Sequence, residues 1–174
     1  ITYADGTEVG NDLHLRLRAR LDLYANVRPI KLYRGVSSPL AGWLAGQIDY
    51  VIVRENTEDL YSGIEFEQGT EDNRKFIEFL KANFPKHYAK IRFPNTSGIG
   101  IKNVSIEGTE RLFRSAIEYA IANRRKSVTI VHKGNILKYT EGSFRGWAYA
   151  LAEREFGAQT YTWQQWEKTK AKSG

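Results

Sequence analysis

The chain has 174 residues, 41% of them hydrophobic and 26% charged, which suits one globular domain, and no apolar run reaches the roughly 18 residues of a membrane span. Cysteine is absent, which excludes disulfides, thiolate metal sites and cysteine nucleophiles and, with no visible signal peptide, favours a cytoplasmic protein. The net charge of +6 suits an anionic partner such as a phosphate, a polycarboxylate or nucleic acid, although a solvated basic surface has the same composition.

The N-terminal part is predicted to form a loop, a helix and an edge strand. Loop 1–10 is followed by apolar residues at helical spacing, which predict a helix. Asn11 or Asp12 can cap the N-terminus of this helix. Segment 24–33 is rich in β-formers, but Pro29 restricts it to an edge or bent strand. Further elements are predicted at 48–54 (a buried strand), 64–66 (a short strand) and 71–84 (a helix).

The second half is predicted to alternate strands with helices. Ser105 or Thr109 can cap a helix that runs through Asn123, and Thr140 can cap a last helix that Gly157 ends. The first of these helices has one apolar face, formed by Leu112, Ala116, Ile117, Ala120 and Ile121. Strands are predicted at 90–93 and 99–104, as an antiparallel ribbon, and at 127–131, buried. This order predicts an α/β fold with at least partly parallel pairing.

Polar side chains follow two of the predicted strands. Strand 48–53 leads into Arg54, with Tyr61 close behind, and strand 127–131 leads into Lys133 and Asn135. Ligands of open α/β sheets bind beyond the carboxyl ends of strands, so these residues are candidates for a site, and solvated loops are the alternative. Lys133 and Tyr61 could transfer protons if desolvated, or could be purely structural.

Three arginines form the second candidate cluster: Arg18, Arg28 and Arg54. Their guanidinium groups could bind a di- or tricarboxylate bidentately if they converge, and would be separate surface residues if they do not. The sequence has no phosphate-binding loop and no G-x-G-x-x-G motif, and its three histidines have no metal-ligand spacing.

Five segments resemble the β-decarboxylating dehydrogenases: LDLYANVRP (21–29), VIVRENTEDLYSGIEF (51–66), SGIGIK (97–102), EGTERLFRSAIEYAIAN (107–123) and VTIVHKGNILKYTEGSFRGWAYALAEREFG (128–157). The last of them, with the E-Y-A-I-A-N run before it, is most similar to prokaryotic NADP-dependent isocitrate dehydrogenases, of the isocitrate/isopropylmalate dehydrogenase family. The resemblance covers roughly residues 12–157 and is far denser than a chance motif match.

The resemblance implies the small domain and clasp of that family's fold, with the large nucleotide-binding domain mostly absent. On this division 1–23 belongs to the large domain, 24–58 and 106–157 form the small α/β domain, 59–105 is a clasp-like insertion and 158–174 is a polar tail. In the family these parts form the dimer, so we expect a homodimer through 59–123 and 140–156. No membrane partner is expected, and nucleic acid is the least favoured partner because no recognition helix is visible.

The resemblance also implies roles for individual residues. Arg18, Arg28 and Arg54 match the substrate-carboxylate arginines. Tyr61 matches the tyrosine that protonates the enolate, Lys133 matches the lysine that reaches into the neighbouring subunit, and Asn135 matches the asparagine near the nicotinamide. The implied cofactors are NADP and Mg²⁺ or Mn²⁺, although NAD remains open. We expect this chain to bind neither group alone, because the matching metal aspartates and most of the nucleotide site lie outside it.

The substrate loop departs from the family. Asp12 and His14 stand where the family has serine and asparagine, and a carboxylate beside an anionic substrate costs about 1–4 kcal/mol of repulsion. The chain also begins with Ile1, so we expect it to be processed, trimmed or part of a longer protein. Two functions therefore remain as alternatives. The first is a portion of an NAD(P)-dependent oxidative decarboxylase of a 2-hydroxy acid, which is inactive alone and associates with a missing second half. The alternative is a non-catalytic dimerising protein that binds or inhibits a full-length dehydrogenase.

Overall fold

The computed structural model describes residues 13–39, 42 and 45–170, and it divides into two compact units. Unit 1 combines Ile1–Thr57 with Val104–Gly174, and unit 2 is Glu58–Asn103. The bounds of unit 2 lie close to the 59–105 expected for the insertion. Within the described residues, no helix is both long enough and apolar enough to span a membrane.

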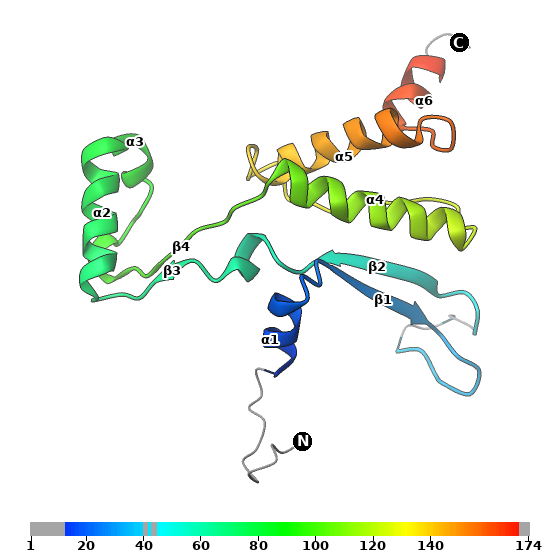
Figure 1. Ribbon diagram of the computed structural model, residues 1–174, viewed down its shortest axis with the longest axis horizontal. Coiled ribbons are helices and arrows are strands. Elements are labelled where there is room, and N and C mark those ends of the chain that lie inside the picture. The colour runs from blue at the N-terminus through cyan, green and yellow to red at the C-terminus, as the bar shows by residue number, and fades with distance from the viewer. Residues whose placement is uncertain (1–12, 40–41, 43–44, 171–174) are drawn as a thin grey trace. The chain divides into compact units, whose positions relative to one another are not determined.

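Unit 1 begins with helix α1 (Leu13–Arg20) and a two-stranded sheet formed by β1 (Ala25–Lys31) and β2 (Asp49–Glu55), shown in blue and cyan in Figure 1. The strands are antiparallel, and the ladder continues past them through the Leu32 N to Ile48 O bond of 3.0 Å. The prediction of partly parallel pairing is therefore wrong for the described strands. Parallel neighbours need a crossover connection, usually a helix, whereas antiparallel neighbours such as β1 and β2 can be joined by a loop.

The prediction of an edge strand with Pro29 is confirmed, since β1 pairs on one side only. The prediction that 48–54 is a buried strand is half right. The strand forms as β2, but no residue in it is buried, because no second sheet or strand covers this ribbon in the described part of the chain.

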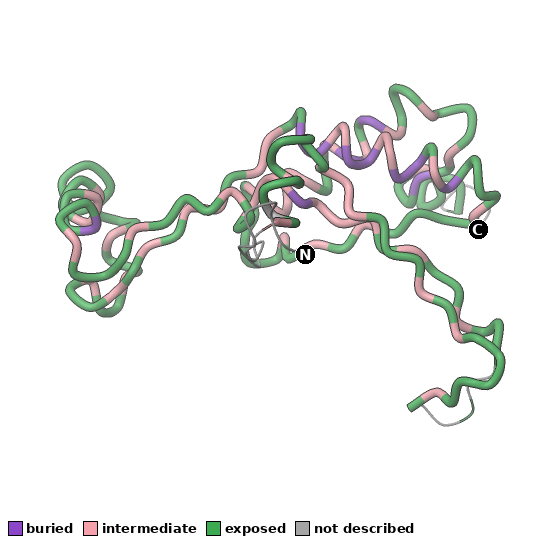
Figure 2. The backbone as a smooth tube through the Cα atoms, turned by 60° about the horizontal axis from the view of Figure 1, so that its bottom comes forward, coloured by how far each residue is buried: buried purple, intermediate pink, exposed green. Residues whose placement is uncertain are grey.

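Helices α4 (Ile106–Ala122) and α5 (Glu141–Phe156) pack together and form the core of unit 1. The core cluster contains Phe113, Ala148 and Leu151, with the Phe113 and Phe144 ring centroids 5.0 Å apart. Figure 2 shows the buried residues concentrated along these two helices. Ser105 caps α4 as predicted, since its hydroxyl accepts a hydrogen bond from Gly108 N at 2.9 Å.

Three other predictions for unit 1 need correction. Ile121 is 41% exposed rather than part of the apolar face, and Thr140 precedes α5 without a side-chain capping bond. Segment 127–131 is not a strand, because it pairs with neither strand of the described sheet. Gly157 does follow the end of α5, and the tail contains a helix, α6 (Trp163–Lys170), that was not predicted.

Unit 2 consists of one helix of 13 residues and several elements of four residues or fewer. Thr70 caps α2 (Glu71–Asn83) by accepting a hydrogen bond from Asn73 N at 3.3 Å. The predicted ribbon of 90–93 with 99–104 is wrong, because 90–93 follows a helix as a turn and β4 (Ile99–Gly100) pairs with β3 (Glu65–Phe66). Among the residues of unit 2, Asn73 alone is buried. The elements are the 3-10 helices η1 (Asp59–Ser62) and η2 (Pro94–Thr96), strands β3 (Glu65–Phe66) and β4 (Ile99–Gly100), and helices α2 (Glu71–Asn83) and α3 (Pro85–Tyr88).

Candidate functional site

Two of the candidate arginines share one face of the β1–β2 ribbon. Arg54 is paired with Asn26, and Arg28 is paired with Ile52. Because side chains alternate along a strand, Asn26 and Arg28 point to the same side, and their partners point there too. Arg28 and Arg54 are thus diagonal cross-strand neighbours, at a separation of roughly 7–8 Å for such pairs. Arg28 Nε donates to Asn26 Oδ1 at 3.2 Å, which orients its guanidinium group along this face.

The third arginine, Arg18, lies in the last turn of α1 and is half-buried. Its carbonyl accepts a hydrogen bond from Leu23 N at 3.0 Å, which closes the turn between α1 and β1. Leu23 O in turn accepts from Asn56 Nδ2 at 2.9 Å. Asn56 is only 5% exposed and lies two residues after Arg54. The backbone that carries Arg18 is therefore connected to the backbone that carries Arg54 by two hydrogen bonds.

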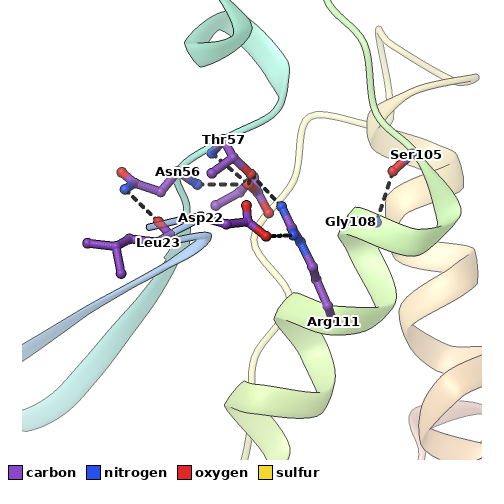
Figure 3. Close-up of polar contacts among 8 residues, drawn as sticks. Asp22, Leu23, Asn56, Thr57, Ser105, Gly108 and Arg111 are labelled. Carbon is purple, nitrogen blue, oxygen red and sulfur yellow. Dashed lines mark hydrogen bonds and ion pairs between the residues drawn. The ribbon is translucent and has the colours of Figure 1, made fainter. Parts of the chain in front are cut away.

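A carboxylate organises the end of β2. Glu55 Oε1 accepts three hydrogen bonds, from Asn56 N at 2.9 Å, from Thr57 N at 2.8 Å and from Thr57 Oγ1 at 2.8 Å. Backbone amides that would otherwise lack a partner after the strand ends are satisfied in this way. Figure 3 shows this group beside the turn that contains Asp22 and Leu23.

Arg111 on α4 joins the same group. One terminal nitrogen lies 2.7 Å from Asp22 Oδ2, and the other donates to Thr57 Oγ1 at 2.7 Å. Its guanidinium group also lies over the Tyr24 ring, 4.5 Å from the centroid. Sequence reasoning missed Arg111, because its partners are 54 and 89 residues away and no local pattern signals so distant a pairing.

The opposite end of β2 is also connected to the region following α4. Arg125 donates to Asp49 Oδ1 at 2.8 Å and to Asp49 O at 3.4 Å. This hydrogen bond and the positive charge lower the pKa of Asp49 below its ordinary value. Asp49 and Thr57 thus mark two ends of the strand, each held by a different arginine.

Lys133 and Asn135 lie in a tight turn before α5, and both side chains are exposed. Lys133 N donates to Glu141 Oε2 at 3.0 Å, and Gly134 N donates to His132 Nδ1 at 3.0 Å. A Cβ on Gly134 would lie 2.9 Å from Gly142 Cα, so only glycine fits there. The turn that carries Lys133 is thus held by hydrogen bonds from two backbone amides to side chains and by the close approach of Gly134 to Gly142.

The remaining predicted residues lie on other segments of the chain. Tyr61 lies in η1 of unit 2 and is exposed, whereas the three arginines belong to unit 1. His14 is an exposed residue in the first turn of α1, and Asp12 lies outside the described residues. In the described part of the chain, no three His, Asp or Glu side chains gather in a way that could hold a metal ion.

A family model, isocitrate/isopropylmalate dehydrogenase, matches residues 4–164. The chain belongs to this family. It is 55% identical over 162 residues to the NADP-dependent isocitrate dehydrogenase of Staphylococcus aureus, covering 93% of this chain and 37% of that protein. It is 53% identical over 147 residues to the enzyme of Helicobacter pylori, covering 84% and 33%.

Solved structures agree with this assignment. The isocitrate dehydrogenase of Methylococcus capsulatus superposes with a TM-score of 0.60 at 32% identity, over 89% of this chain and 38% of that one. A protein of Thermus thermophilus superposes with a TM-score of 0.60 at 31% identity, over 84% and 25%. The mixed helix-and-sheet fold of a partial isocitrate dehydrogenase domain is thereby confirmed. The chain spans about a third of the length of the curated relatives that it matches.

Proposed function

We propose that this chain is the substrate-binding portion of an NADP-dependent isocitrate dehydrogenase, a cytoplasmic enzyme that oxidises and decarboxylates a 2-hydroxy acid. The observation that carries the proposal is the common face of Arg28 and Arg54, with the turn after Arg18 hydrogen-bonded to the end of β2. Three guanidinium groups on adjoining elements suit a substrate with three carboxylates, since each fork can bind one carboxylate bidentately.

In this proposal the three arginines bind and orient the substrate before any bond changes. Orientation alone lowers the barrier, because it replaces a chance encounter with a fixed geometry. Three positive charges also raise the local concentration of a polyanion. We assign the choice of the accepted acid to Asp12 and to His14, an exposed residue of α1, because these two residues depart from the family's substrate loop.

Tyr61 and Lys133 are assigned the proton transfers. Lys133 assists removal of the proton from the substrate hydroxyl, and Tyr61 donates a proton to the carbon that loses carbon dioxide. Both side chains are exposed in the described chain, as expected if each completes a site only after assembly with other parts. Lys133 in particular extends from a turn that Gly134 and Glu141 hold rigid.

The cofactors are assigned to the longer protein. When bound, NADP accepts the hydride and Mg²⁺ or Mn²⁺ stabilises the negative charge on the substrate. The described carboxylates do not form a metal site, so none of the described residues is assigned to the ion. Asn135, exposed beside Lys133, is the residue assigned to the nicotinamide side of the site.

We further propose that the chain forms a homodimer through 59–123 and 140–156. Unit 2 supports this proposal, because none of its aromatic and aliphatic side chains is buried and Asn73 is its one buried residue. A unit this short needs a partner to bury its apolar surface. Segment 58–103 would then act as the clasp between two copies. Isologous dimer surfaces accept a related subunit as well, so a full-length dehydrogenase is the second candidate partner.

Two measurements test these proposals. Calorimetric titration should show that isocitrate binds more tightly than lactate, a 2-hydroxy acid with one carboxylate, by at least about tenfold. Equal affinities would rule out the tricarboxylate site. Sedimentation should give a dimer mass, and mixing with the Staphylococcus aureus enzyme reveals whether mixed dimers form. A chain that stays monomeric and does not bind that enzyme would contradict both the homodimer and the mixed dimer.

A further inference from the structure

We propose that Arg111 is a positioning residue that sets the mutual placement of the three substrate arginines. The inference rests on the substrate site proposed above and adds to it a residue that does not itself contact the substrate. Its basis is the connection that Arg111 makes between α4, the turn after α1 and the end of β2.

The guanidinium group of Arg111 holds two different segments at once, as Figure 3 shows. One terminal nitrogen contacts Asp22 Oδ2 in the turn, and the other donates to Thr57 Oγ1 beyond β2, both at 2.7 Å. The face of the same group lies 4.5 Å from the centre of the Tyr24 ring, immediately before β1. A planar fork with donors at fixed angles can satisfy all three contacts, whereas a flexible ammonium group cannot.

Each contact leads to a segment that carries a substrate arginine. Thr57 Oγ1 donates its own hydrogen bond to Glu55 Oε1 at 2.8 Å, and Glu55 directly follows Arg54. Asp22 precedes Leu23, whose amide bonds to the carbonyl of Arg18 at 3.0 Å. Tyr24 stands one residue before the strand that carries Arg28.

Two physical reasons make such a contact necessary. Three guanidinium groups repel one another in the absence of the anionic substrate, so their backbones must be held from outside. The turn itself is strained, because Asp22 has a φ of 46°, a conformation that favours glycine. The ion pair with Arg111 holds that carboxylate, and with it the turn, in the conformation that the site requires.

The contact with Asp22 is partly exposed, with side-chain exposures of 31% for Arg111 and 66% for Asp22. Exposed ion pairs contribute little to global stability, so removal of this arginine should leave the fold intact while freeing the turn. A matched control is available in Arg125, which makes the same kind of contact with Asp49 at the other end of β2.

The experiment compares Arg111→Gln, Arg111→Lys and the control Arg125→Gln in the 174-residue chain. Amide hydrogen exchange without ligand is measured at Leu23, Asn56 and Thr57, and isocitrate affinity is measured by calorimetry. Arg111→Gln should speed exchange at these amides and weaken isocitrate binding by about tenfold or more. The unfolding temperature of Arg111→Gln should be no lower than that of Arg125→Gln. Arg111→Lys should recover part of the affinity, and Arg125→Gln should change neither readout.

The possible failures are distinguishable. Unchanged exchange at the three amides in Arg111→Gln overturns the positioning role, whatever the ligand does. Equal losses in Arg111→Gln and Arg125→Gln overturn it as well, because they would show a merely structural effect. If the unmodified chain fails to bind isocitrate but exchange responds as expected, the positioning of the three segments stands and the proposed substrate site fails.

Discussion

Arg28 and Arg54 are diagonal neighbours on one face of an antiparallel ribbon, because Arg54 pairs with Asn26 and Arg28 pairs with Ile52. The relationship is a property of register, and a shift by one residue would send Arg54 to the opposite face. At the far end of the same ladder Asp49 is paired with Lys31, and Lys31 Nζ lies 3.8 Å from Asp49 Oδ2.

The first prediction concerns coupling between these two arginines. Arg28→Gln and Arg54→Gln should each weaken isocitrate binding by about tenfold to a hundredfold, and the double variant should lose less than the sum, since both act on one ligand. Calorimetric titration at fixed ionic strength measures this. Arg145→Gln removes the same charge from an exposed position on α5 and should have little effect. Single losses no larger than that of Arg145→Gln would indicate two surface arginines that do not bind the ligand.

The second prediction concerns the turn that carries Lys133. Gly134→Ala should destabilise the chain by about 1–3 kcal/mol, because the new methyl group would overlap Gly142 and His132. Gly146→Ala, in open space within α5, should instead stabilise it by about 0.5–1 kcal/mol. Urea unfolding gives both values. Equal effects of the two substitutions would show that the turn is not held by the close approach.

The third prediction concerns pH and the α4–α5 pair. The Arg114 guanidinium, bonded to Glu155 at 2.7 Å, lowers the pKa of Glu155 from 4.5 to about 2. A lowered folded pKa means that the ionised carboxylate stabilises the fold above pH 4.5, and that this stabilisation is lost as pH falls toward 2. Glu155→Gln should therefore lower the unfolding temperature at about pH 7 and have almost no effect near pH 2.

Glu153→Gln is the control for that measurement, since the side chain of Glu153 makes a long, 3.5 Å contact with Thr162. Its unfolding temperature should follow that of the unmodified chain across the pH range. A constant difference between Glu155→Gln and the unmodified chain over the whole acidic range would contradict the assigned ion pair.

The fourth prediction concerns the core. Leu151 is 0% exposed and packs against Phe113 and Ala148, so Leu151→Ala should cost about 2–5 kcal/mol of unfolding free energy. Ile121→Ala, on the exposed side of α4, should change it by less than about 0.5 kcal/mol. Chemical denaturation of the two variants provides the comparison, and similar losses would mean that the α4–α5 core is placed incorrectly.

Helices α1, α2, α4 and α5 were predictable because their signals are local. Ser105 caps α4 through a bond to a residue three positions later, and the apolar face of that helix repeats within each turn. The assignment of Ile121 to the buried face was wrong, because periodicity identifies the apolar face of a helix but does not show how far along the helix its packing partner extends. Strand 127–131 failed for a related reason, since β-propensity does not supply a neighbour to pair with.

Arg54 and Lys133 were proposed as site residues because each follows the apolar part of a predicted strand. In the structure Arg54 lies within β2, and no strand immediately precedes Lys133 in the described chain. Arg18 and Arg28 were added because they carry the same charge as Arg54. Arg111 was not found, because helical spacing alone does not distinguish it from neighbouring surface arginines. Its role depends on contacts that only the folded chain creates.

Unit 2 leaves and rejoins the chain at almost the same point, since Asp59 N bonds to Asn103 O at 2.9 Å. Ser62 Oγ bonds to Asn103 Oδ1 at 2.8 Å, and Lys102 pairs with Asp59. The two ends of unit 2 are therefore held together by contacts that do not involve the residues between them. Evolution can therefore lengthen, shorten or exchange the intervening segment as a cassette. The β1–β2 ribbon and the α4–α5 pair would then be inherited unchanged while the surface of unit 2 diversifies.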